Sequence, residues 1–188
     1  MSTSNLFKSY NQLITGAENC LAANLTMPAL VLIYTAIDTV SWIASEDENR
    51  LVGESFEAWV DKWMLSKYPL PCTSEELYAA RCGILHTLTP NSRLTDKKGV
   101  RRIAYATGNA NQTDLEESIR LLEYPGLVAV HVDDIFSSFR HGFEDFIEML
   151  EKDPTIKDLF TQKASKHFAT MDMSIVSDFL ASAKKGRG

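Results

Sequence analysis

Arg81 and His86 are the residues of this 188-residue sequence whose chemistry stands out, because they lie five positions apart in a stretch with helical patterning. Arginine stays charged, and its planar fork matches two oxygens of a phosphate. Histidine exchanges protons near neutral pH, so it can act as general base or general acid. RNA carries its own nucleophile, the ribose 2′-hydroxyl. The two side chains therefore indicate phosphodiester cleavage that needs no metal.

Asp38 is the other unusual residue, since it is a lone carboxylate in a nearly all-apolar segment. A buried charge must be paired or neutralised. Two roles fit: Asp38 orients Arg81 or His86, or it anchors a backbone or tryptophan N–H group. A third interpretation is a small-molecule or nucleotide pocket built around Asp38 and its neighbours one turn away, Tyr34 and Trp42.

The helix expected around Arg81 has two faces that suit burial. One face should meet the core of a bundle and carries Leu77, Ala80, Ile84 and Leu88. The opposite face holds three small residues and the histidine, namely Ala79, Cys82, Gly83 and His86. Small residues let another backbone approach closely, and the expected element is a second helix, either of this chain or of a second copy. Arg81 lies about 40° from the core face and His86 about 180° from it, so a two-fold interface is one way to bring both groups into one cleft.

Residues 77–87, L-Y-A-A-R-C-G-I-L-H-T, resemble the signature helix of the HEPN superfamily. Those proteins are helical bundles that carry an arginine, four to six residues, and then a histidine. Many are metal-independent endoribonucleases of toxin–antitoxin and defence systems, and they usually dimerise through this helix. The resemblance covers the chain to about residue 90. Some members carry a modifiable tyrosine two residues after the histidine; Leu88 stands there in this sequence, so that regulation is not expected.

The resemblance implies a metal-independent endoribonuclease or RNA-binding effector. His86 would be the general acid or base, and Arg81 would stabilise phosphate charge. Asp38 is added to this catalytic set on the separate ground that a lone buried carboxylate could orient either group. It also implies a homodimer through this helix and a possible cognate protein partner. The alternative is a non-catalytic helical interaction or regulatory protein, in which Arg81 pairs with a carboxylate of the bundle and His86 fills an interface.

A basic cluster follows the helix and provides candidate contacts to an RNA backbone. Arg93, Lys97, Lys98, Arg101 and Arg102 are opposed only by Asp96. The alternative interpretation is a solvated loop. The formal net charge of −6 argues against a broad, nonspecific grip on nucleic acid, although it permits a local basic site.

No metal or other cofactor is expected. His131, Asp133, Asp134 and His141 are the nearest approach to a metal-ligand set, but capping of the following helix explains Asp133. The three cysteines, Cys20, Cys72 and Cys82, form no C-x-x-C pair and are read as reduced thiols.

The patterning predicts a mostly α-helical protein. Four helices are expected at residues 5–23, from Pro28 to about 44, at 55–67, and from a cap at Thr73 or Ser74 to about 89. β-prone runs at 100–107 and 126–132 flank a helix at 113–123, and their relative direction is left open. Further helices are expected at 133–152, where five apolar side chains line one face, and near 155–166 and 174–184.

We therefore expect an HEPN-like up-and-down bundle with extra C-terminal helices and a small two-stranded β element. Residues 1–188 form one domain, in which 1–90 are the four-helix bundle and 91–188 an appended β element with C-terminal helices. The apolar run 27–44 contains Asp38 and is read as a core helix, not a membrane span. The N-terminus lacks the features of a secretory signal. We expect a cytoplasmic protein with no membrane partner.

Overall fold

The computed structural model describes residues 4–45, 47, 49–89, 91–123 and 126–167, without the side chains of 4–6, 96–98 and 166–167. In this part of the chain, helices dominate and two strands pair. The helices are α1 (Ser4–Ala22), α2 (Thr26–Ala44), α3 (Val52–Trp59), the π-helical segment η1 (Val60–Leu65), α4 (Ser74–Thr87), α5 (Arg93–Lys98), α6 (Gln112–Leu121), α7 (Val132–Lys152) and α8 (Pro154–His167). The prediction of a mostly α-helical protein with a small two-stranded element is confirmed. The helix expected at 174–184 lies outside the described residues.

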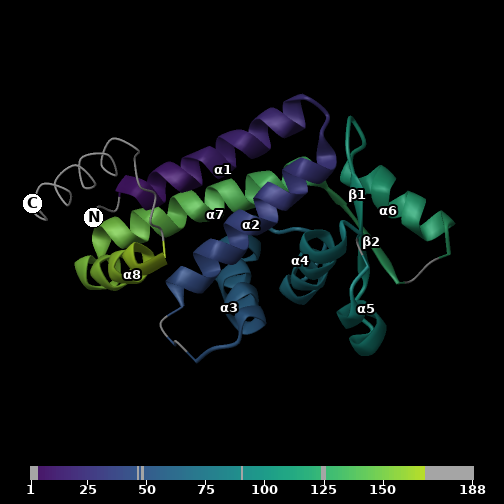
Figure 1. Cartoon of the computed structure of the whole chain (residues 1–188). Coiled ribbons are helices and arrows are strands. Elements are labelled where there is room, and N and C mark those ends of the chain that lie inside the picture. Colours follow the sequence, from purple (N-terminus) through teal and green to yellow (C-terminus); the bar gives the residue numbers. More distant parts are fainter. Residues whose placement is uncertain (1–3, 46, 48, 90, 124–125, 168–188) are drawn as a thin grey trace, which may run out of the picture.

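α2 is the central helix, with α1, α3, α4, α7 and α8 packed against it. α1 and α7 lie side by side, and the rings of Tyr10 and Phe143 stack with centroids 4.9 Å apart (Figure 1). By length and composition α2 is able to cross a membrane, since an 18-residue stretch of it has a mean hydropathy of 1.5, but half of that stretch is buried inside the protein. The cytoplasmic location remains a prediction.

The two strands, β1 (Arg102–Ala106) and β2 (Leu127–His131), are parallel and pair from Arg102 with Leu127 to Ala106 with His131. α6 connects them, as parallel strands require a crossover. The sheet and α6 lie at the opposite end of the molecule from α8 (Figure 1). This βαβ unit packs on the bundle through β1, which contacts α4.

One hydrophobic core joins described residues from both of the predicted parts of the chain, before and after residue 90. It joins Tyr34 and Leu77 of the first part to Ile103, Val130 and Phe139 of the second, all of them at most 1% exposed. The apolar face expected on α7 is confirmed, because its buried residues include Phe136, Phe139, Phe143, Phe146 and Leu150. α7 is thus an integral part of the bundle, packed against α2 and η1.

The π-helical turn of η1 was not predicted from the sequence, and it lies in close contact with α7. A Cβ atom placed on Gly142 of α7 would lie 2.5 Å from the main-chain oxygen of Trp63. The backbone of η1 therefore rests directly on α7, at a position where only glycine leaves room. The π-helical turn of η1 thus coincides with a close backbone contact between η1 and α7.

Candidate functional site around helix α4

Helix α4 begins and ends with well-formed caps. The Thr73 hydroxyl accepts a hydrogen bond from the N–H of Glu76 (3.2 Å), and the Glu76 carboxylate accepts one from the N–H of Thr73 (2.9 Å). This reciprocal pairing satisfies two donors that a helix start would otherwise leave open. At the other end Leu88 takes a left-handed conformation with φ of 54°. Leu88 is consequently 61% exposed, and its expected place on the core face is wrong because the helix ends before it.

Asp38 of α2 is the partner of Arg81. Its Oδ2 accepts a hydrogen bond from Nη2 of Arg81 at 2.5 Å, and the side chains of Arg81 and Asp38 are 13% and 23% exposed. Burial opposes the charge of Arg81, but the hydrogen bond and the charge of Asp38 outweigh burial, so the pKa of the guanidinium lies above its usual value. Of the roles considered for Asp38, orienting Arg81 is the one the geometry displays.

The ion pair between Arg81 and Asp38 leaves hydrogen-bonding capacity unused. Within the described part of the chain, Nε of Arg81 and Oδ1 of Asp38 are buried without a partner. Nη1 of Arg81 has only the weak acceptor Sγ of Cys82, 4.0 Å away, and the guanidinium lies 5.9 Å from the ring centre of Tyr78. A guanidinium has five N–H donors. Arg81 is therefore held in place by one strong contact, while part of its fork has no strong partner among the described residues.

Arg81 and His86 border one open face of α4. The partly exposed residues between them are Tyr78, Cys82 and Leu85, and His86 itself is exposed. With about 100° per residue, Tyr78, Cys82 and Leu85 form the middle of this face, Arg81 lies at one edge and His86 at the other. The two groups are separated by roughly 7.5 Å along the helix axis. No hydrogen bond or ring contact joins Arg81 to His86 among the described side chains. A ligand or a second protein lying over this face would meet both.

The small-residue side of α4 is covered by the same chain. Ala79 and Gly83 are buried, and a Cβ on Gly83 would lie 2.4 Å from the main-chain oxygen of Thr89 and 2.8 Å from that of Asn91. The close approach of another backbone is confirmed, but the expectation of a second helix is wrong, because the approaching segment is the loop that follows α4. A second copy of the protein could therefore contact α4 only on the face that carries Tyr78, Cys82 and Leu85.

The basic cluster is divided between structural and available groups. Arg101 donates from Nε to Oε1 of Glu76 (2.6 Å) and from Nη2 to Oε2 (3.0 Å), which ties the start of β1 to α4. Arg102 donates to the side chain of Asn91 at 2.9 Å. Arg93 is exposed on α5, whereas the side chain of Lys97 lies outside the described residues. Arg101 is engaged by two carboxylate oxygens, so Arg93 and Arg102 are the better placed of the described candidates.

The side chains of Tyr34 and Asp38 are already paired within the described part of the chain. The Tyr34 hydroxyl, fully buried, hydrogen-bonds to that of Tyr105 at 2.9 Å, and Asp38 is occupied by Arg81. The cleft of the described structure lies at the other end of α2, around Ser41 and Ser45. The interpretation that placed a small-molecule pocket around Asp38, Tyr34 and Trp42 therefore has no support from the geometry.

His131 has a structural role that the sequence did not reveal. Its Nδ1 accepts a hydrogen bond from the N–H of Asp133 (3.2 Å) and caps α7, while Nε2 lies 2.8 Å from the oxygen of Gly108. Asp133 was expected to be the cap; it is exposed, and the residue at the cap position is His131. Both ring nitrogens of His131 are thus used by backbone groups.

Comparisons with protein-family models, curated proteins and solved structures return no match to this chain. No family is therefore assigned to the chain, and the HEPN resemblance rests on residues 77–87 alone.

Proposed function

We propose that the protein acts on RNA as a metal-independent endoribonuclease or RNA-binding effector of HEPN type, with its site on the open face of α4. The observation that carries this proposal is the ion pair between Arg81 and Asp38. It holds a guanidinium with unused donors at one edge of a face whose other edge carries the exposed His86. A phosphate over this face would have a charge-stabilising group and a proton-transfer group within reach of the same surface.

The roles follow from the chemistry of RNA cleavage. His86 takes the proton of the 2′-hydroxyl or gives one to the leaving 5′-oxygen. Arg81 stabilises the negative charge on the phosphoryl oxygens, and Asp38 acts through Arg81 as a positioning residue. The attacking oxygen forms a bond to phosphorus as the bond to the 5′-oxygen breaks. The products are a 2′,3′-cyclic phosphate and a 5′-hydroxyl end.

A homodimer that forms across the open face of α4 would bring Arg81 and His86 from different protomers close together. Two copies of α4 that cross about a two-fold axis near Cys82 place Arg81 of one protomer toward His86 of its partner. Tyr78, Leu85 and the exposed Leu88 supply apolar surface for this contact. Arg93 and Arg102 would extend the site along the RNA backbone. A cytoplasmic location and control by a cognate protein, as in toxin–antitoxin or defence systems, belong to this proposal.

The test is cleavage of a mixed-sequence RNA in the presence of EDTA. We expect the wild-type protein to cut and the His86→Ala variant to lose at least about 100-fold in rate. Because His86 is exposed, this variant should fold normally. Arg81→Lys keeps the charge but loses the planar fork, so it should cut poorly. Arg120→Ala, on exposed α6, is the matched control and should cut like wild type. If the His86→Ala variant cuts RNA as fast as the wild-type protein, the proposed role of His86 in RNA cleavage is refuted.

The second candidate is a non-catalytic helical interaction protein. The observation that favours it is the neutralisation of Arg81, whose side chain is only 13% exposed and is paired with Asp38. This candidate predicts that wild-type protein neither cuts nor binds RNA. It also predicts that substitutions on the open face of α4, such as Leu85→Asp, abolish a stable complex with another protein.

A further inference from the structure

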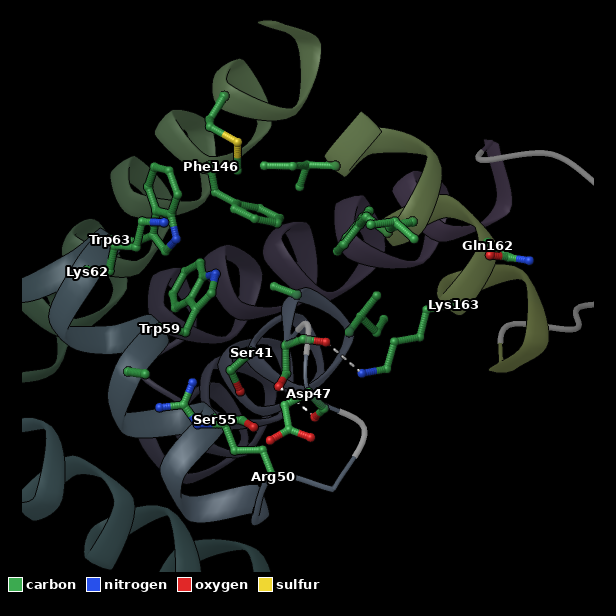
Figure 2. A pocket seen from close by; sticks show the side chains of 18 residues that line it. Ser41, Asp47, Arg50, Ser55, Trp59, Lys62, Trp63, Phe146, Gln162 and Lys163 are labelled. Carbon is green, nitrogen blue, oxygen red and sulfur yellow. Dashed lines mark hydrogen bonds between the residues drawn. The ribbon is translucent and has the colours of Figure 1, made fainter. Parts of the chain in front are cut away.

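A cleft of about 600 Å³ lies at the end of the bundle opposite the βαβ unit. The C-terminal end of α2, the loop that follows it, α3, η1, α7 and α8 all contribute to its walls (Figure 2). This volume is within the range of sites that bind small organic molecules. Neither Arg81 nor His86 lines it. The cleft is therefore separate from the proposed RNA site, and any ligand that binds there must be inferred from the residues that line it.

One wall of the cleft is a continuous cluster of aromatic rings. The ring of Phe146 packs nearly perpendicular to those of Trp59, Trp63 and Phe160, with centroids 6.2, 5.4 and 5.3 Å away. Edge-to-face contacts of this kind fix the rings relative to one another. On the α8 side the exposed Leu159 adds apolar surface, 57% of which is open to solvent. The body of a ligand in this cleft would thus meet preformed apolar surface.

Among the described residues, the polar lining of the cleft carries more positive than negative charge. Three cations line it, Arg50, Lys62 and Lys163, and the carboxylate among the described lining residues is Asp47. Arg50 and Lys62 are exposed, and neither forms an ion pair with a described residue. Lys62 lies 5.0 Å from the ring centre of Trp63, so its charge is next to the aromatic wall. The described side chains of the cleft therefore favour an anion.

Lys163 closes the cleft beside α2. Its ammonium group donates hydrogen bonds to the main-chain oxygens of Trp42 (2.8 Å) and Ser45 (3.0 Å), and Figure 2 shows its side chain reaching across toward α2. This contact satisfies carbonyls at the C-terminal end of the helix. It fixes α8 against α2, and it leaves Arg50 and Lys62 as the cations without a structural task.

Trp59 provides a second, independent observation that points to a ligand, because it carries a hydrogen-bond donor without an acceptor. Its side chain is 4% exposed, and Nε1 is buried without a hydrogen-bond acceptor in the described structure. A buried donor without a partner costs about 1–3 kcal/mol. Figure 2 shows the indole nitrogen on the side of the ring toward Phe146 and the interior of the cleft. A ligand with an acceptor group, after a small adjustment of the lining side chains, would satisfy this donor.

We propose that this cleft binds an organic anion with an apolar body, such as a medium-chain or aromatic carboxylate. The body packs against the ring cluster of Phe146, and the acidic head lies at Arg50 and Lys62. The inference is independent of the activity proposed for α4, because no residue is shared between the two sites.

The test is calorimetric titration of the full-length chain with decanoate and 2-naphthoate, each compared with its neutral alcohol, decan-1-ol and 2-naphthalenemethanol. We expect saturable one-to-one binding of at least one acid and binding of its alcohol that is about tenfold weaker or less. The two acids distinguish an aliphatic from an aromatic body. No saturable heat with either acid, or equal binding of acid and alcohol, would overturn the proposal.

The location is tested with two variants that carry the same change of charge. Arg50→Gln with Lys62→Gln should weaken binding of the acid about tenfold, and because both residues are exposed the fold should be kept. Arg120→Glu makes the same change of charge at one exposed position of α6, at the opposite end of the molecule from α8, and should leave affinity within about twofold. Equal loss in both variants would show a general charge effect and would refute the site.

Discussion

Replacement of Asp38 by asparagine tests whether Arg81 is held as the structure indicates. The substitution keeps the shape of the side chain but removes the negative charge that faces the guanidinium. Arg81 and Asp38 are 13% and 23% exposed and are joined at 2.5 Å. Asp38→Asn therefore leaves a mostly covered cation without its counter-charge.

The expected loss lies between two known limits. Fully exposed ion pairs contribute about 0–1 kcal/mol, and removal of one partner from a fully buried pair costs about 3–5 kcal/mol. Because both side chains are mostly covered but not fully buried, we expect Asp38→Asn to lower the free energy of unfolding by about 2 kcal/mol. Arg81→Met should cost a similar amount. The double variant should lose less than the sum, with a coupling energy of about 1.5 kcal/mol.

Urea unfolding followed by tryptophan fluorescence measures these free energies. Repetition in high salt should change the coupling little, since a covered pair is poorly screened. A coupling energy below about 0.5 kcal/mol would place the pair with ordinary surface contacts. That result would refute the argument that Asp38 positions Arg81.

Three further results are expected from single groups. Burial, with the nearby charge of Glu76, raises the pKa of the Cys72 thiol to about 12, so iodoacetamide at pH 8 should modify only the other two thiols of the native protein; a third adduct by mass spectrometry would contradict this. Gly83→Ala places a Cβ 2.4 Å from a main-chain oxygen and should lower the free energy of unfolding by about 2 kcal/mol, whereas unchanged urea stability would disprove the contact. The hydrogen bond from Lys67 lowers the pKa of the Asp145 carboxyl in the folded protein. The stabilising effect of this pair is therefore fully present above the pKa that Asp145 has in the unfolded chain, and it is lost as the pH falls through the lower pKa of the folded state. Asp145→Asn should therefore flatten the acid side of the stability–pH curve, and an identical acid side in both proteins would refute the pairing.

Local signals predicted most of the helices and both strands, although α5 was not predicted. The spacing of Phe139, Phe143 and Phe146 indicated the buried face of α7, and Thr73 marked the start of α4 because its hydroxyl can accept from the helix backbone. The β-prone runs were located to within a few residues. Their parallel direction could not be predicted, because it depends on how α6 returns the chain across the bundle.

Non-local contacts explain what the sequence left open or predicted wrongly. Asp38 was identified as a carboxylate that needs a partner, but the choice of Arg81 depends on how α2 and α4 cross, 43 positions apart in sequence. Gly83 signalled a close backbone, and only the path of the chain after α4 shows that the loop at Thr89 fills the space. Leu88 continued the apolar spacing of α4, yet its left-handed backbone ends the helix and turns it outward.

The cleft near α8 was missed for a similar reason. Trp59, Trp63 and Phe146 carry ordinary core patterning, and the exposed cations Arg50 and Lys62 have ordinary surface patterning. No spacing along the chain joins the two groups, because they meet only when α3, η1 and α7 pack together. The unsatisfied nitrogen of Trp59 becomes visible only in the folded structure.

The measurement that tests the role of Arg81 and His86 most directly uses a short RNA with one cleavage site and the same oligonucleotide with a 2′-deoxyribose at that position, both in EDTA. We expect cleavage of the all-ribose strand to a 2′,3′-cyclic phosphate end and complete protection of the substituted bond. Cleavage of both strands, or a 3′-hydroxyl end, would show that the 2′-oxygen is not the nucleophile and would refute the proposed roles of Arg81 and His86.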